Sequence, residues 1–332
     1  MSIEINKTCS PLGLVAALAM AFALSAQPAQ AQWRPEKNVE VVVGVTPGGS
    51  MDRTARDVQM FLQKSLGGRN STVNNKPGGG HSIALTYLNQ QRGDPHYLQV
   101  IHFLLFTNYL TGRSTLNHTN VTPIALLFDE NFGFAVKADS PIKNANDMVQ
   151  RLKKDPGALS ISVSTGLGTV NHILAARVGQ AAGVDPKKMK YVVFNSASEG
   201  VTSVAGGHVD VTVTTLFSIQ SMVDKGLLRF IAVATPKRIP GVLAQVPTLH
   251  EQGISVDLAS WRSVVAPAGL TGPQIAYWDD MFSRMTKSEE WRANLEKNFL
   301  SDRYLSSADT RKFFDNEFPK YKSILTELGM TK

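Results

Sequence analysis

The chain has 332 residues, 43% of them hydrophobic, and its 34 lysines and arginines outnumber its 27 aspartates and glutamates to give a formal charge of +7. This length and composition suit a globular protein of two domains with a substantial core. The basic residues are scattered, with no stripe of interleaved aromatic residues, so we expect no nucleic acid partner. A positive field favours capture of small anions, although solvated helix faces explain the same charges.

The first 31 residues have the pattern of a secretory signal. Lys7 precedes an apolar stretch from Leu12 to Leu24, and Ala29-Gln30-Ala31 supplies a small-residue cleavage site, which predicts cleavage after Ala31. The apolar stretch is shorter than the roughly 20 residues of a membrane anchor. The single cysteine, Cys9, lies in this segment, so we expect a mature chain without disulfide or thiol chemistry.

The mature chain begins with a strand, a glycine loop and a helix. A β-branched run from Val41 to Val45 leads into Thr46-Pro47-Gly48-Gly49-Ser50, and apolar residues then recur at helical spacing until Gly67-Gly68. Ser50 or Asp52 is expected to cap the helix. Free backbone N–H groups and the helix dipole there suit a carboxylate or phosphate, and an ordinary strand-to-helix turn is the alternative.

Further strands and helices alternate along the next hundred residues. The strand Ser71 to Asn74 precedes the glycine segment 75–82 and a helix through Leu88, and three more strands are expected at 97–102, 123–128 and 132–137. The region from Asp129 to Asp139 is the expected crossover into a second domain.

The second domain is expected to start with a helix from Asn146 to Lys153. The strand Ser160 to Ser164 then leads through a glycine loop into another helix, and strands follow at 191–194, 209–215 and 230–234. This alternation predicts parallel sheets covered on both faces. After a last strand, Trp261 to Ala266, the pattern predicts helices only, packing back on the first domain.

The common catalytic and cofactor motifs are missing from the sequence. There is no GxxxxGK[ST], HExxH or GxSxG pattern, and Gly166-Leu167-Gly168 continues to Asn171 where a dinucleotide site requires glycine. The seven histidines lack metal-ligand spacing. Carboxylates near the loops are few, and for Asp52 a helix cap is favoured over a general base. We therefore expect no cofactor, no metal and no enzymatic activity.

A set of motifs along the whole mature chain resembles the receptors of tripartite tricarboxylate transporters, the TctC or Bug family. The motifs are Pro47-Gly48-Gly49 with Asp52, Asn75-Lys76-Pro77-Gly78-Gly79-Gly80, Gly206-Gly207-His208-Val209-Asp210, Val246-Pro247-Thr248 with Glu251-Gln252-Gly253, Ser260-Trp261-Arg262, and Ala266-Pro267-Ala268-Gly269.

The resemblance implies an α/β fold of the periplasmic-binding-protein type (type II-like), with two lobes that are each a mainly parallel sheet flanked by helices. A ligand cleft lies between the lobes. We expect lobe 1 at residues 32–133 and 257–332, and lobe 2 at 134–256. The implied function is that of a monomeric periplasmic receptor, which captures a small organic carboxylate, a di- or tricarboxylate, and delivers it to a membrane permease. Closure of the lobes about the hinge would give the loaded receptor a form that the permease can recognise.

The resemblance also implies a ligand site. Receptors of this family hold one ligand carboxylate between the loop after the first strand and a facing loop of the second lobe. In this sequence the two loops correspond to residues 46–50 and 164–169, and neighbouring loops are expected to line the rest of the cleft. The expected ligand-binding residues are Thr46, Pro47, Gly48, Gly49, Ser50, Gly79, Gly80, His81, Ser82, Ser164, Thr165, Gly166, Gly168, Thr169, His172, Asn195, Ser196, Thr214 and Arg262.

Two positions bear on the far end of the ligand. Family members that bind amino acids have an acidic residue after the strand at 209–213, and here Thr214 and Thr215 follow, so we expect amino acids to bind poorly. Arg262 is either a partner for a distal carboxylate or a brace of the hinge. A co-receptor for a membrane sensor kinase and a secreted hydrolase of anionic esters are the alternative functions.

Overall fold

The first strand, β1 (Val39–Val43), carries three consecutive valines that are completely buried. β-Branched side chains pack well on a pleated surface, and burial on both faces places β1 inside a sheet that is covered on two sides. The structure is a computed structural model that describes residues 33–164, 166–256 and 258–332. The expected signal segment and Thr165 lie outside the described residues.

β1 belongs to a six-stranded sheet of order β11-β4-β10-β3-β1-β2. β1 pairs in parallel with β2 and β3, whereas β10 pairs antiparallel with β3 and β4, and β11 antiparallel with β4. Four strands run one way and two the other, so the sheet is mixed, not purely parallel. Its other strands are β2 (Ser71–Asn75), β3 (Tyr97–Ile101), β4 (Val121–Glu130), β10 (Ser260–Pro267) and β11 (Leu300–Leu305).

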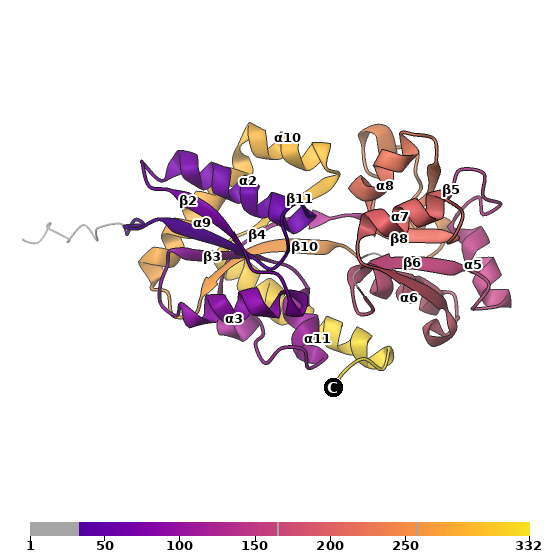
Figure 1. The fold of residues 1–332 in the computed structure, drawn as a ribbon, viewed down its shortest axis with the longest axis horizontal. Helices are drawn as coiled ribbons and strands as arrows, with labels where there is room; N and C mark the ends of the chain where they lie inside the picture. The colour runs from indigo at the N-terminus through magenta and orange to yellow at the C-terminus, as the bar shows by residue number, and fades with distance from the viewer. Residues whose placement is uncertain (1–32, 165, 257) are drawn as a thin grey trace, which may run out of the picture. The chain divides into compact units, whose positions relative to one another are not determined.

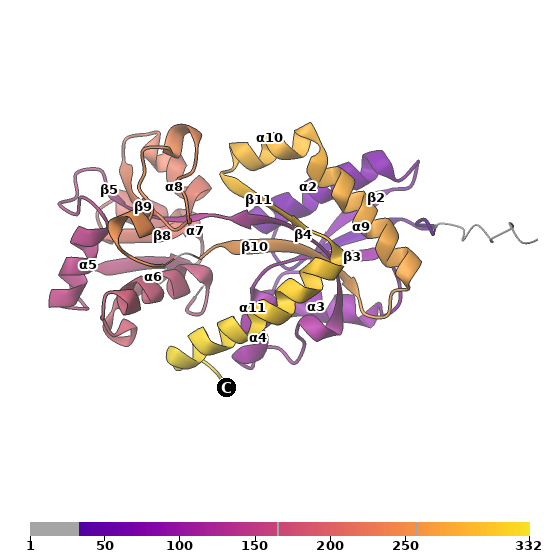
Figure 2. The ribbon, with the colours of Figure 1, turned by 180° about the vertical axis from the view of Figure 1, so that it is seen from behind.

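Helices cover both faces of this sheet (Figures 1 and 2). One face carries α2 (Ser50–Ser65), α9 (Gly272–Lys287) and α10 (Glu289–Lys297), and the other carries α3 (Ser82–Gln90), α4 (Leu104–Leu110) and α11 (Ser307–Glu327). Trp261 of β10 is buried against the aromatic rings of α4 and α11, as expected of a core residue.

The expectation that only helices follow β10 was wrong, because β11 pairs with β4 at the edge of the sheet. β11 reads Leu-Ser-Asp-Arg-Tyr-Leu, and its residues are half-buried or exposed. Such an edge strand lacks the buried alternation that identifies a strand in the sequence, so its pairing with β4 decides its conformation.

The second sheet has five strands in the order β7-β6-β8-β5-β9. β6 pairs in parallel with β7 and β8, and β5 pairs antiparallel with β8 and β9, so this sheet is mixed as well. Its strands are β5 (Phe132–Lys137), β6 (Ser160–Ser164), β7 (Lys190–Phe194), β8 (Val211–Thr215) and β9 (Leu228–Val233).

Four helices cover the second sheet, with α7 and α8 on one face and α5 and α6 on the other (Figure 1). They are α5 (Ala145–Lys154), α6 (Val170–Ala181), α7 (Ala197–Ala205) and α8 (Leu216–Val223). Short 3-10 turns complete the described secondary structure: η1 (Gly79–His81), η2 (His118–Asn120), η3 (Pro186–Lys188), η4 (Gly241–Leu243) and η5 (His250–Gln252).

The chain passes between the sheets at two neighbouring points. β4 ends at Glu130 and β5 begins at Phe132, while the returning strand β10 begins at Ser260, which pairs with Glu130. Two adjacent crossovers of this kind are where hinges between lobes are found in other proteins. We propose that the first crossover lies at Asn131, two residues before the expected end of this part of lobe 1, because Phe132 already pairs with β8.

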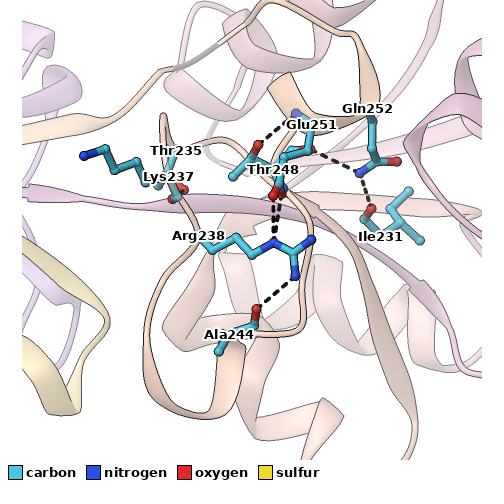
Figure 3. Close-up of polar contacts among 8 residues, drawn as sticks. All are labelled: Ile231, Thr235, Lys237, Arg238, Ala244, Thr248, Glu251 and Gln252. Atoms are coloured by element: carbon cyan, nitrogen blue, oxygen red, sulfur yellow. Dashed lines mark hydrogen bonds and ion pairs between the residues drawn. The ribbon is translucent and has the colours of Figure 1, made fainter.

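The segment between β9 and β10, which carries the Val246-Pro247-Thr248 and Glu251-Gln252-Gly253 motifs, is fastened to its own lobe (Figure 3). The Thr248 N–H donates to Glu251 Oε2 (2.8 Å), and the Glu251 N–H donates to Thr248 Oγ1 (3.0 Å). Arg238 Nε donates to the same carboxylate (2.9 Å), and Gln252 Nε2 donates to the Ile231 carbonyl (2.9 Å). These residues therefore organise the return of the chain toward the hinge.

Candidate ligand-binding cavity

A cavity of about 670 Å³ lies beside the crossovers, lined by residues from elements of both sheets. This volume is in the range of small-molecule sites. The first turns of α2, α6, α7 and α8 all contribute to its lining. Because each helix N-terminus presents free N–H groups and a partial positive charge, the cavity is suited to an anion.

Asp52 organises the loop between β1 and α2. Its buried carboxylate accepts hydrogen bonds from the Gly48 N–H (2.9 Å), Arg56 Nε (2.8 Å) and Asn75 Nδ2 (2.8 Å). Burial alone would raise the pKa of Asp52, but these hydrogen bonds outweigh it and hold the pKa below its usual value. The expectation of a side-chain cap was wrong: Gly49 is the N-cap residue of α2, and no side chain caps it.

The end of β1 approaches the η1 turn so closely that only glycine fits at position 44. A Cβ atom there would lie 2.7 Å from the Cβ and 2.9 Å from the Cα of His81. His81 itself adopts a left-handed backbone conformation (φ 78°) after three glycines with positive φ. The two glycine segments together bring His81 to the wall of the cavity.

His81 and His102 form part of this wall, with ring centroids 4.7 Å apart. Burial, and to a lesser extent the charge of Arg262, lowers the pKa of His81 to about 4. Burial also lowers the pKa of His102 well below its ordinary value, helped by His81 and Arg262. Both rings are therefore neutral at pH 7 and offer polar groups without charge.

The facing loop of the second sheet is held by its own side chains. Thr169 Oγ1 donates to the carbonyls of Ser164 (3.2 Å) and Gly166 (2.9 Å). The Gly168 N–H donates to His172 Nδ1 (3.2 Å), and burial lowers the pKa of His172 to about 4. His172 therefore supports the loop from behind and does not line the cavity, whereas Ser164 and Thr169 do.

Two more helix starts complete the wall of the second lobe. Ser196 Oγ caps α7 by accepting from the Glu199 N–H (3.2 Å), and Glu199 in turn accepts from the Asn195 N–H (3.1 Å). Thr215 Oγ1 caps α8 at Ser218. The carboxylate of Glu199 is thus engaged in a hydrogen bond at the start of α7. Asp210, another carboxylate near the loops, accepts from Ser160 and does not line the cavity.

Arg262 joins the two crossover strands at the base of the cavity. Its side chain is buried and donates to Glu130 Oε2 (2.6 Å), Ser50 Oγ (2.8 Å) and Ser260 Oγ (3.0 Å). Arg262 belongs to β10, and Glu130 is the last residue of β4. The guanidinium therefore has a carboxylate partner within the protein.

The structure brings most of the expected site residues together. The cavity is lined by Thr46, Gly48, Gly49, Ser50, Gly80, His81, Ser164, Thr169, Asn195, Ser196, Thr214 and Arg262. Pro47, Gly79, Gly166, Gly168 and His172 support the loops without lining it, Ser82 lines a small neighbouring cavity, and Thr165 is outside the described residues.

Sequence reasoning missed several lining residues, above all Arg53, Asn108, Arg113, Glu130 and Phe217. Arg53 follows Ser50 by three residues and so lies on the same helix face, which is a local signal. Arg113 has no such signal, because its position depends on how α4 packs. The described residues contain no group of three or more histidine, cysteine or acidic side chains that could hold a metal ion.

Two mixed α/β lobes with a cavity beside a double crossover define the class of bilobal solute-binding proteins. The chain belongs to the family described as the tripartite tricarboxylate transporter family receptor, whose model matches residues 54–330. A curated relative, the UPF0065 protein in the gbd 5'region of Cupriavidus necator, is 28% identical over 321 residues, which cover 96% of each chain.

Solved structures share the fold at lower identity. An R. palustris protein with adipate has a TM-score of 0.78 at 22% identity and covers 90% of this chain and 99% of its own. MatC from Rhodopseudomonas palustris with bound malate has a TM-score of 0.74 at 21% identity and covers 88% of this chain and 99% of its own. The two-lobed α/β expectation is confirmed by these structures.

Proposed function

We propose that this protein is a periplasmic receptor that captures a small organic carboxylate, a di- or tricarboxylate, in the cavity between its lobes. The loaded receptor delivers the ligand to the permease of a tripartite tricarboxylate transporter. Residues 1–31 act as the export signal, cleaved after Ala31. Among the residues that the structure describes, no helix is long and apolar enough to cross a membrane.

The observation that carries this proposal is the convergence of four helix N-termini on one cavity. Helix N-termini bind anions through fixed N–H groups, which lose no side-chain entropy on binding. Of the described residues that line the cavity, Glu130 is the only acid, and Arg262 neutralises it. The ligands of the adipate and malate complexes are both dicarboxylates, which supports the same class of ligand.

We further propose that one carboxylate lies between the first turn of α2 and the loop before α6. Ser50, Ser164 and Thr169 line this part of the cavity. Arg262 is assigned as the brace of the hinge, because its guanidinium already binds Glu130. Turnover is not expected, since the carboxylates at Asp52, Glu199 and Asp210 all serve structural hydrogen bonds.

A thermal-shift screen tests the proposal. The mature protein, residues 32–332, is heated with mono-, di- and tricarboxylates, aromatic acids and amino acids. At least one di- or tricarboxylate is expected to raise the melting temperature increasingly with concentration, because it binds only the folded state. Amino acids are expected to have little effect, since no free carboxylate among the described lining residues can pair with an ammonium group.

Two outcomes would contradict the proposal. One is the absence of stabilisation by any carboxylate at millimolar concentration, and the other is stabilisation by an amino acid alone. Chemical change of a bound ligand, followed by chromatography of the incubated mixture, would point to an enzyme instead.

A further inference from the structure

Among the described residues that line the cavity, basic side chains outnumber acidic ones. Its charged lining residues are Arg53, Arg113, Arg262 and Glu130. Glu130 forms an ion pair of 2.6 Å with Arg262, and both side chains are nearly buried. Two arginines, Arg53 and Arg113, therefore have no acidic partner among the described residues that line the cavity.

The histidines of the wall do not change this balance. Burial keeps His81 and His102 neutral at pH 7, as their lowered pKa values indicate. The charge available to a ligand at neutral pH thus comes from two guanidinium groups and from the helix N-termini. A ligand with one carboxylate would leave one of the two arginines unmatched, whereas a dianion would match both.

The two arginines belong to different parts of the cavity wall. Arg53 lies in the first turn of α2, next to the loop 46–50, and its guanidinium stacks on Phe217 of α8 with 4.4 Å between Cζ and the ring centroid. Arg53 is therefore close to the place proposed for the first carboxylate.

Arg113 lies in the loop after α4, on the wall formed by Gly80, His81 and Asn108. Its backbone N–H donates to the Asn108 carbonyl (2.7 Å), and the next residue, Ser114, donates to the same oxygen (3.1 Å). The loop is thus fixed to the end of α4. Within the described part of the chain, the exposed guanidinium of Arg113 makes neither an ion pair nor a hydrogen bond.

We propose that Arg113 binds the second carboxylate of the ligand and makes the receptor selective for dicarboxylates over monocarboxylates. This inference rests on the proposed function of the cavity. It assigns to Arg113 the role that the sequence suggested for Arg262, whose guanidinium is committed to Glu130. A guanidinium fork matches a carboxylate in two parallel hydrogen bonds, so the loss of Arg113 removes recognition at one end of the ligand only.

Isothermal titration of Arg113→Gln tests the proposal. The probes are glutarate and adipate, each compared with the monocarboxylate of the same chain length, valerate or caproate. We expect the dicarboxylate Kd of the variant to rise about tenfold or more and the monocarboxylate Kd to change less than about threefold. Because Arg113 is exposed, the variant is expected to fold.

Two matched variants identify the cause of any loss. Arg151→Gln removes an exposed arginine of α5 outside the cavity and is expected to leave both affinities unchanged. Arg53→Gln is expected to weaken mono- and dicarboxylates by a similar factor, because it lies at the common carboxylate.

The proposal is overturned if Arg113→Gln weakens both kinds of ligand equally, if it weakens neither, or if the selective loss appears in Arg53→Gln instead. Absence of binding of every carboxylate to the wild-type protein is a different result, because it would refute the proposed function itself.

Discussion

Two single residues, Arg262 and Glu130, connect the two crossover strands through an ion pair. They lie on β10 and β4, and their side chains are 4% and 11% exposed. Taking two charges out of water is costly, and the pair is tolerated because Ser50 and Ser260 add hydrogen bonds to the guanidinium. The pair thus holds the return strand against the outgoing strand.

Arg262→Met is expected to destabilise the protein by about 3 kcal/mol, because it leaves Glu130 buried without a partner. The free energy of unfolding in urea measures this change. The double variant Arg262→Met with Glu130→Leu removes both charges and is expected to recover most of the loss. If the single variant were as stable as the wild type and lost only dicarboxylate affinity, Arg262 would be a ligand residue and not a brace.

The unit of β1, its loop and α2 shows how a short sequence motif positions part of the cavity wall. Buried valines form the strand and glycines permit the turn. Asp52 fastens the loop to α2 through the Gly48 N–H and fastens α2 to the end of β2 through Asn75. Gly44 then lets η1 pack against the end of β1. Local chemistry thus accounts for the loop, while the contact with η1 depends on residues 37 positions away.

Gly44→Ala is expected to destabilise the protein by about 1–3 kcal/mol, because the new methyl group would overlap backbone and side-chain atoms of His81. Urea unfolding measures the change. Gly272→Ala at the start of α9 is the matched control, since a Cβ there meets nothing within 4 Å. Equal stabilities of the two variants would show that η1 shifts away at no cost.

Each lobe of the molecule carries a histidine whose neutral form is favoured in the folded state. His81 belongs to the first lobe and His172 to the second, and burial lowers the pKa of each to about 4 from an ordinary 6.5. Between these two pH values the unfolded chain binds protons that the folded chain does not. The contribution of each histidine is therefore complete above pH 6.5 and is lost as the pH falls toward 4.

The free energy of unfolding is therefore expected to fall between pH 7 and pH 4.5, with His81 and His172 each contributing on the order of 2 kcal/mol and His102, whose pKa is also lowered by burial, adding to the fall. Urea titrations at several pH values measure this dependence. His172→Gln is expected to flatten the curve, and His208→Gln, which changes an exposed histidine, is expected to leave it unchanged. A wild-type curve that rises toward acid pH would refute the assignment.

The succession of most strands and helices, the glycine loops and the family could be predicted from the sequence, because these depend on local periodicity, turn chemistry and motif order. It also located the loops 46–50 and 164–169 at strand ends, where open α/β sheets bind ligands. Twelve of the nineteen expected site residues line the cavity as a consequence.

The direction of strand pairing, the edge strand β11 and the partners of the arginines could not be predicted from the sequence. Pairing between distant segments depends on packing, which local patterns do not encode. Arg262 and Arg113 look alike as charged residues in the sequence. Their difference arises because β10 places Arg262 beside Glu130, while the packing of α4 leaves Arg113 at the cavity wall, where no other described lining residue is an acid that could pair with it.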